Sequence, residues 1–121
     1  MIGIGVDLCE VERMRASLAR TPTLRDRLFT EDEQAYCERR PDPTERYAAR
    51  FAAKEAVLKA MGVGVGACRW RDIEVVRADS GAPSVQLHGA ALALAESHGI
   101  SRWLLTMTHT RQAAEAIAVA L

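Results

Sequence analysis

Hydrophobic residues occupy every second position at the start of the chain, from Ile2 to Leu8, and glycines or Asp7 fill most of the positions between them. A period of two predicts a β-strand at residues 2–9 with one apolar face. The opposite face is nearly bare around Asp7, which allows another backbone or a ligand to come close. Asp7 is therefore either a strand-end or helix-capping acid or a ligand of a metal ion.

A helical period runs through residues 45–61. This stretch is rich in good helix formers, contains no Gly or Pro, follows a proline pair and ends at Gly62. Phe51, Glu55 and Leu58 fall on one stripe of the predicted helix. A carboxylate among apolar positions is costly unless a cation, a metal ion or a hydrogen bond compensates it, so we interpret Glu55 as part of a site.

Two shorter helices are predicted before the long one. Apolar residues recur at helical spacing directly after the first strand, and a capping box of Thr30 and Glu33 predicts a helix to about residue 39. Arg13 and Arg20 share the exposed face of the earlier helix. Such charges are typical of a solvated face. The alternative is a docking surface for an acidic partner, because guanidinium groups pair with carboxylates and phosphates.

Alternating segments after the long helix predict the rest of the fold. Strands are expected at residues 70–78, 84–87, 103–109 and 116–121, and a helix at residues 89–97. The last strand is apolar on both faces, which favours a central or covered position. Leu92 and Ala95 are expected to face the core from the helix. This order predicts an α+β protein, a single domain over residues 1–121, with a mainly antiparallel sheet and one long helix packed on it.

Composition narrows the classes of function. The 16 basic residues, 14 of them Arg, are balanced by 16 acidic ones, and six aromatic residues show no stacking pattern, so we expect no nucleic-acid partner. No apolar run approaches the ~20 residues of a membrane span, and no signal peptide is recognisable. Cys9, Cys37 and Cys68 lack metal-ligand spacing and are interpreted as reduced thiols of a cytoplasmic protein.

The candidate chemistry is concentrated around Asp7 and Glu55. Both lysines of the chain, Lys54 and Lys59, flank Glu55, and neither carboxylate has a nearby His or Cys that would complete a zinc site. Oxygen ligation suits Mg²⁺, which binds through one or two carboxylates, waters and substrate phosphates. The alternative is an exposed i,i+4 ion pair between Glu55 and Lys59. The pattern favours Mg²⁺-dependent chemistry on a phosphate or pyrophosphate.

Two further features leave alternatives open. Gly62, Gly64 and Gly66 follow the long helix with a spacing that is weak as a phosphate cradle and typical of a flexible or tightly turning connection. His109 lies at the end of the strand predicted at residues 103–109, on the parity of its buried set. It is interpreted as a satisfied structural residue or as a catalytic one.

Several segments resemble those of a known family. Residues 5–13, Gly-Val-Asp-Leu-Cys-Glu-Val-Glu-Arg, resemble the first signature of the holo-acyl-carrier-protein synthases, the small 4′-phosphopantetheinyl transferases. Residues 50–60, Arg-Phe-Ala-Ala-Lys-Glu-Ala-Val-Leu-Lys-Ala, resemble the second. The runs at residues 62–64, 72–74, 81–83 and 108–110 extend the resemblance over nearly the whole chain.

The resemblance implies transfer of the 4′-phosphopantetheine arm of coenzyme A to a serine of an apo acyl carrier protein, with release of adenosine 3′,5′-bisphosphate. It implies that Asp7 and Glu55 hold Mg²⁺ and that Lys59 contacts a phosphate or the surroundings of the attacking serine. Glu55, directly or through a metal-bound water, is the first candidate for the general base. His109 is the second, and binding of a coenzyme A phosphate is its alternative role.

The same resemblance assigns the binding surfaces. Nucleotide contacts are expected from Arg50, Lys54, Gly62, Gly64, Gly81, Pro83 and Thr108. Arg13 and Arg20 would meet the acidic recognition helix of the carrier. The small members of the family are homotrimers with sites at subunit junctions, so a homotrimer is expected. Val63 and Ala82 depart from the family pattern and residues 106–109 replace a commoner serine-containing run; the first two motivate a second hypothesis, a carrier-binding module with impaired catalysis.

Overall fold

The computed structural model describes residues 1–121. In chain order its elements are β1 (Gly3–Glu10), α1 (Val11–Arg20), α2 (Leu24–Leu28), α3 (Glu31–Cys37), α4 (Thr44–Met61), the 3₁₀ turn η1 (Trp70–Asp72), β2 (Ile73–Arg77), β3 (Pro83–Leu87), α5 (Gly89–Ser97), β4 (Trp103–His109) and β5 (Ala113–Ala120). All strand pairs are antiparallel, which confirms the predicted α+β class. The strand expected from residue 70 begins only at Ile73, because residues 70–72 wind into η1.

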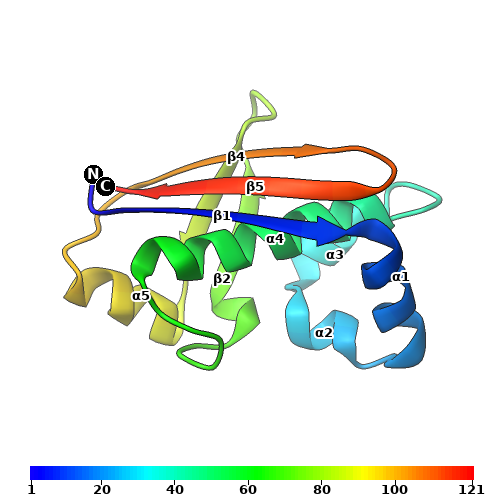
Figure 1. Ribbon diagram of the computed structural model, residues 1–121, viewed down its shortest axis with the longest axis horizontal. Helices are drawn as coiled ribbons and strands as arrows, with labels where there is room; N and C mark the ends of the chain where they lie inside the picture. Colours follow the sequence, from blue (N-terminus) through cyan, green and yellow to red (C-terminus); the bar gives the residue numbers. More distant parts are fainter.

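The strands form two sheets. One has three strands in the order β1-β5-β4, and the other is the β2–β3 hairpin. Strand β5 has a neighbour on each side, which confirms the central position predicted for the last strand. Helix α4 crosses one face of the three-stranded sheet, with α1, α2 and α3 near one of its ends and α5 near the other (Figure 1).

The bare face of β1 is the face that packs against α4. A Cβ atom added to Gly3 would lie 1.9 Å from the carbonyl oxygen of Ala60, and one added to Gly5 would lie 2.0 Å from that of Ala56. The two backbones therefore touch, and only glycine fits between them. The alternating hydrophobic residues of β1 consequently point to the opposite side, where Ile4 remains 60% exposed in the single chain.

Small side chains allow α4 to approach the sheet so closely. Fully buried alanines line the facing surfaces of α4 and β5, namely Ala52, Ala53, Ala56, Ala114, Ala116, Ala118 and Ala120. Larger side chains form a second cluster beneath α1 and α3, where the rings of Phe29 and Tyr47 lie 4.6 Å apart. The first cluster fixes α4 against β1, and the second fixes the helices that follow β1.

The helix boundaries follow the predicted signals. The capping box is present, since Thr30 Oγ1 accepts from the Glu33 N–H and Glu33 Oε1 accepts from the Thr30 N–H. Helix α3 ends at Cys37, two residues before the expected end. Gly62 ends α4 in the left-handed conformation with φ of 72°. None of these helices has the length and apolar character that crossing a bilayer requires.

The prediction for the inward face of α5 is partly wrong. Ala95 is buried as expected, but Leu92 is 43% exposed, and Ala91 takes the inward position instead. Ala91 and Ala95 are four residues apart and so define one stripe of the helix. Both alanines of this stripe belong to the main core cluster.

Candidate active site

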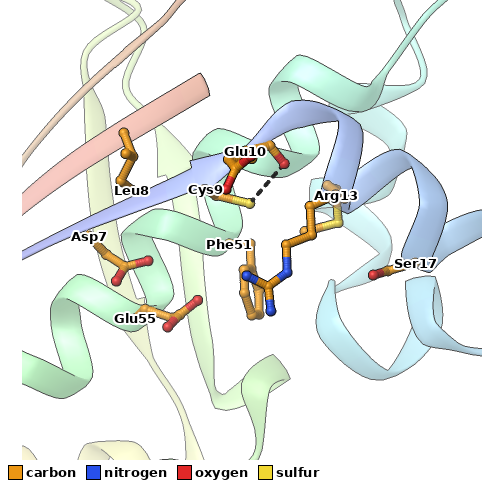
Figure 2. A pocket seen from close by; sticks show the side chains of 9 residues that line it. Asp7, Leu8, Cys9, Glu10, Arg13, Ser17, Phe51 and Glu55 are labelled. Atoms are coloured by element: carbon orange, nitrogen blue, oxygen red, sulfur yellow. Dashed lines mark hydrogen bonds between the residues drawn. The ribbon is translucent and has the colours of Figure 1, made fainter. Parts of the chain in front are cut away.

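Two carboxylates from different elements meet at the edge of the α4–β1 contact. Asp7 comes from β1 and Glu55 from α4, and Figure 2 shows their carboxyl groups turned toward the same space. Both residues are half-buried. Burial raises the pKa of Glu55, and the neighbouring carboxyl group of Asp7 raises it further. Adjacent acids of this kind are stabilised by a cation.

Lys59 supplies one positive charge to this pair. Its Nζ lies 2.9 Å from Asp7 Oδ1 and donates to the Val6 carbonyl oxygen at 3.0 Å. The hydrogen bond to Asp7 raises the pKa of Lys59. The side chain of Lys59 is 55% exposed, so its ammonium group is accessible to a ligand. Lys59 on α4 thus pairs with Asp7 on β1 and does not form the alternative i,i+4 ion pair with Glu55.

A cavity of about 480 Å³ opens beside the carboxylates. It is lined by Asp7, Leu8, Cys9, Glu10, Arg13, Met14, Ser17, Phe51 and Glu55. Burial raises the pKa of the Cys9 thiol to about 11, and the nearby Glu55 and Asp7 contribute. No three or more His, Cys, Asp or Glu side chains are arranged so that they could hold a metal ion together. A donor set of two carboxylates beside open space fits Mg²⁺, which keeps several waters and binds substrate phosphates.

Helix α1 presents the arginines expected to meet a partner. Arg13 and Arg20 are exposed as predicted, and Arg13 lies at the wall of the carboxylate cavity (Figure 2). Arg15 has a different role. Its Nη1 donates to Asp42 Oδ1 at 3.0 Å and to Thr44 Oγ1 at 3.1 Å, which joins α1 to the start of α4. The exposed arginines therefore sit on a helix that is held in place relative to Glu55.

The expected nucleotide contact of Lys54 is wrong for this structure. Its side chain has no exposed surface, and its Nζ donates to Glu33 Oε1 at 2.7 Å and to the carbonyl oxygens of Trp70 and Ile73. Burial lowers the pKa of Lys54, against the opposing charge of Glu33. Consecutive helix positions point about 100° apart, so Lys54 turns inward while Glu55 faces the cavity.

A second cavity, of about 400 Å³, borders α4 in another direction. Arg50 lines it and is only 2% exposed, its guanidinium carbon lies 4.2 Å from the centre of the Tyr36 ring, and its Nε has no hydrogen-bond partner. Burial lowers the pKa of Arg50. Arg46 and Arg77 approach the same ring at 4.2 and 5.1 Å. None of these three arginines pairs with a carboxylate, so we name this space the arginine cavity and regard it as suited to an anion.

His109 lines the arginine cavity and not the carboxylate cavity. A single chain therefore does not bring this histidine to Glu55. Thr108 precedes it on β4, and side chains alternate along a strand, so Thr108 faces the other side of the sheet, where it lines a shallow hollow with Glu115. Thr108 and His109 therefore lie on different surfaces of the molecule.

The remaining expected nucleotide contacts are far apart within one chain. Gly62 and Gly64 belong to the loop that follows α4, whereas Gly81 and Pro83 belong to the β2–β3 hairpin. Figure 1 shows this loop and the tip of the hairpin on opposite sides of the molecule. If these residues contact one ligand, a second copy of the chain has to contribute some of them.

The sequence analysis did not identify several residues of the arginine cavity, nor the buried partner of Lys54. Arg46 precedes Arg50 by four positions, a helical spacing that would have placed both on one face of α4. Tyr36 and Arg77 join the arginine cavity from α3 and β2, and nothing in their spacing indicates it. Glu33 was recognised only as a helix cap, although the same carboxylate also binds Lys54.

The model of the 4′-phosphopantetheinyl transferase superfamily matches residues 3–120. The chain belongs to this superfamily. A holo-[acyl-carrier-protein] synthase of Moorella thermoacetica is 44% identical over 119 residues, which cover 98% of this chain and 93% of that protein.

Solved structures agree with this assignment. The holo-[acyl-carrier-protein] synthase of Neisseria meningitidis superposes with a TM-score of 0.90 at 31% identity and covers 100% of this chain and 98% of its own. That of Bacillus anthracis, in complex with CoA (3′,5′-ADP), has a TM-score of 0.81 at 31% identity, with 98% and 95% covered. This member of the superfamily is thus an enzyme of phosphopantetheinyl transfer with the fold of these synthases.

Proposed function

We propose that this enzyme transfers 4′-phosphopantetheine from coenzyme A to a serine of an apo acyl carrier protein, with Mg²⁺, and releases adenosine 3′,5′-bisphosphate. The observation that carries the proposal is the meeting of Asp7, Glu55 and Lys59 beside an open cavity. The names of the related synthases support the carrier as acceptor. The Bacillus anthracis neighbour, in complex with CoA (3′,5′-ADP), supports coenzyme A as donor.

The reaction requires charge compensation on a pyrophosphate. The serine oxygen forms a bond to the phosphorus that carries pantetheine, the bond from that phosphorus to the bridging oxygen breaks, and the nucleotide leaves with the electron pair. Mg²⁺ supplies Lewis-acid stabilisation of the phosphate charge when bound. Asp7 and Glu55 would hold it, and the exposed ammonium of Lys59 lies where it can pair with a phosphate oxygen.

We assign the general base to Glu55. Its carboxyl group faces the carboxylate cavity where the serine would arrive, so it lies where it can accept the proton of the serine hydroxyl. His109 takes the alternative role that the resemblance allows, because it lines the arginine cavity with Arg50. There it would bind a phosphate of coenzyme A.

The arginine cavity would receive a phosphate of the nucleotide. Arg50 is buried with a free Nε, and Arg46 and Arg77 share the same aromatic ring without a carboxylate partner. Guanidinium groups bind phosphate through paired hydrogen bonds, which would satisfy the buried nitrogen. Gly62, Gly64, Gly81, Pro83 and Thr108 remain proposed nucleotide contacts.

A homotrimer with sites between subunits explains the distribution of these residues. Arg50 and Glu55 are five positions apart on α4, so they point about 140° from one another, and one chain presents them to different cavities. The outer face of β1, β4 and β5 is also apolar. Its exposed residues are Ile2, Ile4, Val6, Leu8, Leu104 and Ile117. A second copy of this chain would cover that face and bring its own arginine cavity toward the carboxylates.

Arg13 and Arg20 are the proposed contacts for the carrier. Both are exposed on α1, and Arg13 lines the carboxylate cavity where the acceptor serine has to arrive. An acidic carrier helix would pair with them. The free state of Cys9, Cys37 and Cys68 fits a cytoplasmic setting for this encounter.

Incubation of the protein with an apo acyl carrier protein, coenzyme A and Mg²⁺ tests the proposal. We expect the carrier to gain the mass of one phosphopantetheine in mass spectrometry, and to gain none with EDTA or with a carrier whose acceptor serine is alanine. Glu55→Gln should abolish the gain. No gain with any of several carriers, or full activity of Glu55→Gln in Mg²⁺, contradicts it.

A carrier-binding module with impaired catalysis remains the second candidate, because Val63 and Ala82 depart from the family pattern. Such a module would bind the carrier without needing coenzyme A or Mg²⁺. Titration of the carrier with and without both ligands therefore separates the two candidates.

A further inference from the structure

Lys54 lies at the centre of a buried polar network on the inner side of α4. Its ammonium group donates to Glu33 Oε1, to the Trp70 carbonyl oxygen and to the Ile73 carbonyl oxygen, so all three of its N–H bonds are used. Neither charged side chain of the Lys54–Glu33 pair has any exposed surface. The ammonium thereby fixes one point of α4 to α3, to η1 and to β2.

Glu33 extends the network away from α4. Its Oε1 also accepts from the Thr30 N–H at 2.9 Å, and its Oε2 accepts from the Val75 N–H at 3.0 Å. The Thr30 hydroxyl donates to Glu74 Oε2 at 2.7 Å, and Glu74 Oε1 lies 3.0 Å from His88 Nε2 at the start of α5. Fully satisfied networks of this kind are rigid, because each group depends on the position of the next.

Two routes connect this network to the carboxylate cavity. The first is covalent, since Lys54 immediately precedes Glu55 on α4. The second runs through Trp70, whose carbonyl oxygen binds Lys54 and whose ring lies 4.9 Å from the ring of Phe51, a wall of the cavity. A shift of Lys54 would therefore turn Glu55 and move Phe51 together.

If position 54 only filled space in the core, an apolar residue there would stabilise the fold at least as well as lysine. Buried ion pairs rarely add net stability over apolar side chains of similar size, so stability does not by itself explain a lysine here. The ammonium group does fix the orientation of the Lys54 side chain, because its three hydrogen bonds go to acceptors on three different elements. It sets the rotation of α4 about its axis at the turn that carries Glu55.

We propose that Lys54 is a positioning residue that, through Glu33 and Trp70, holds Glu55 in the orientation that binds the metal ion with Asp7. This rests on the proposed function of the same site. It replaces the nucleotide contact that the sequence suggests for Lys54. Groups that orient metal ligands in this way typically change metal affinity when removed, while the ligand contacts themselves stay in place.

The test measures metal and nucleotide binding separately. Mn²⁺ binding is measured by electron paramagnetic resonance without substrate, and coenzyme A binding by calorimetry at saturating Mg²⁺. Lys54→Met is compared with the double variant Glu33→Gln/Lys54→Met, which leaves no unpaired buried charge and keeps the experiment usable if the single variant does not fold. Val57→Ala is the control, because Val57 is also fully buried on α4 and its truncation destabilises the helix packing without touching the network.

We expect the Mn²⁺ dissociation constant of both Lys54 variants to rise about tenfold, with turnover reduced alongside. Coenzyme A affinity should stay within about twofold, and Val57→Ala should retain Mn²⁺ affinity despite its lower melting temperature. Wild-type Mn²⁺ affinity in the double variant overturns the inference. Loss of coenzyme A affinity with intact Mn²⁺ binding overturns it too, since that result indicates a direct contact.

The inference and the proposed function fail in different ways. A wild-type protein that binds Mn²⁺ but modifies no carrier rejects the proposed function, and the comparison of Mn²⁺ affinities still decides the role of Lys54. A protein that transfers phosphopantetheine normally in the double variant rejects the positioning role alone.

Discussion

The backbone of Gly5 lies directly against the backbone of Ala56, so that a Cβ atom at Gly5 would come within 2.0 Å of the Ala56 carbonyl oxygen. This contact is what places Asp7, two residues further along β1, beside Glu55 of α4. The geometry of the proposed metal site thus depends on the absence of a side chain. A glycine that looks like a gap in the strand pattern defines the distance between the two carboxylates.

Substitution of Gly5 by alanine should separate β1 from α4. The methyl group meets the Ala56 carbonyl and the Ala60 nitrogen, both backbone atoms that cannot turn aside, so we expect a loss of about 3 kcal/mol in the free energy of unfolding. Urea unfolding measures it. Gly64→Ala is the control for stability, because an added Cβ there meets nothing within 4 Å, and it should change the unfolding free energy by less than about 0.5 kcal/mol. Equal stability of the two variants would contradict the close contact.

Stability at acid pH should depend on Glu74. Burial opposes the charge of this carboxylate, but hydrogen bonds from Thr30 and His88 outweigh it and lower the pKa of Glu74 below its ordinary value of 4.5. A carboxyl whose pKa is lower in the folded state stabilises the fold above its unfolded pKa, and that contribution disappears as the pH falls through the folded value. We therefore expect Glu74→Gln to melt below the wild type at pH 7.

The difference between these two melting temperatures should close as the pH falls below about 4.5. Calorimetry across pH 3–7 measures it. Glu96→Gln on the exposed face of α5 is the matched control, because the Glu96 side chain is exposed and makes no ion pair. If the difference in melting temperature stayed constant with pH, the charge of Glu74 would not contribute to stability.

Charge reversal at Arg13 should weaken the encounter with the carrier. Glutamate at this position repels an acidic helix beside the carboxylate cavity, so the KM for the carrier should rise roughly tenfold or more while the dissociation constant of coenzyme A is unchanged. Steady-state kinetics at two salt concentrations, with calorimetry for coenzyme A, separate these effects. Arg102→Glu, on an exposed residue before β4, should leave both constants as in the wild type.

Self-association should depend on the outer face of β1. Ile4 is 60% exposed there in a single chain, and a charge at its centre would have to be buried in any assembly that covers the face. We expect Ile4→Asp to run as a folded monomer in size-exclusion chromatography with light scattering, and to be inactive if the site lies between subunits. Leu92→Asp, on the exposed face of α5, serves as control and should keep the wild-type mass. A monomeric wild type with full activity would contradict the trimer.

The arginine cavity should recognise the 3′-phosphate of coenzyme A. Arg46→Ala removes one of the guanidinium groups that gather on Tyr36, so we expect the KM for coenzyme A to rise about tenfold. The KM for dephospho-coenzyme A, which lacks that phosphate, should already be high in the wild type and should hardly change in the variant. An equal rise for both donors would assign Arg46 to another part of the nucleotide.

Much of this protein follows from local patterns in the sequence. The period of β1, the capping box at Thr30 and Glu33, and the left-handed Gly62 each depend on residues close together in the chain, and the structure contains all three. Asp7 and Glu55 could be singled out as well, because each is a carboxylate at a position where its pattern leaves it poorly solvated. Local sequence therefore indicated most of the elements and singled out the two acids, although it did not indicate α2 or η1.

The tertiary structure decided which partners nearby side chains contact and whether they are buried or exposed. Lys54 and Lys59 flank Glu55 in the sequence, one residue before it and four residues after it, yet the first is buried against Glu33 and the second reaches Asp7 at the surface. The sequence pattern allowed a backbone to approach the bare face of β1, but it did not reveal that the apolar face of this strand would remain uncovered. Both outcomes depend on how closely α4 approaches the sheet. Alanines and glycines on segments far apart in the chain set that distance, and it becomes visible only when those segments are packed together.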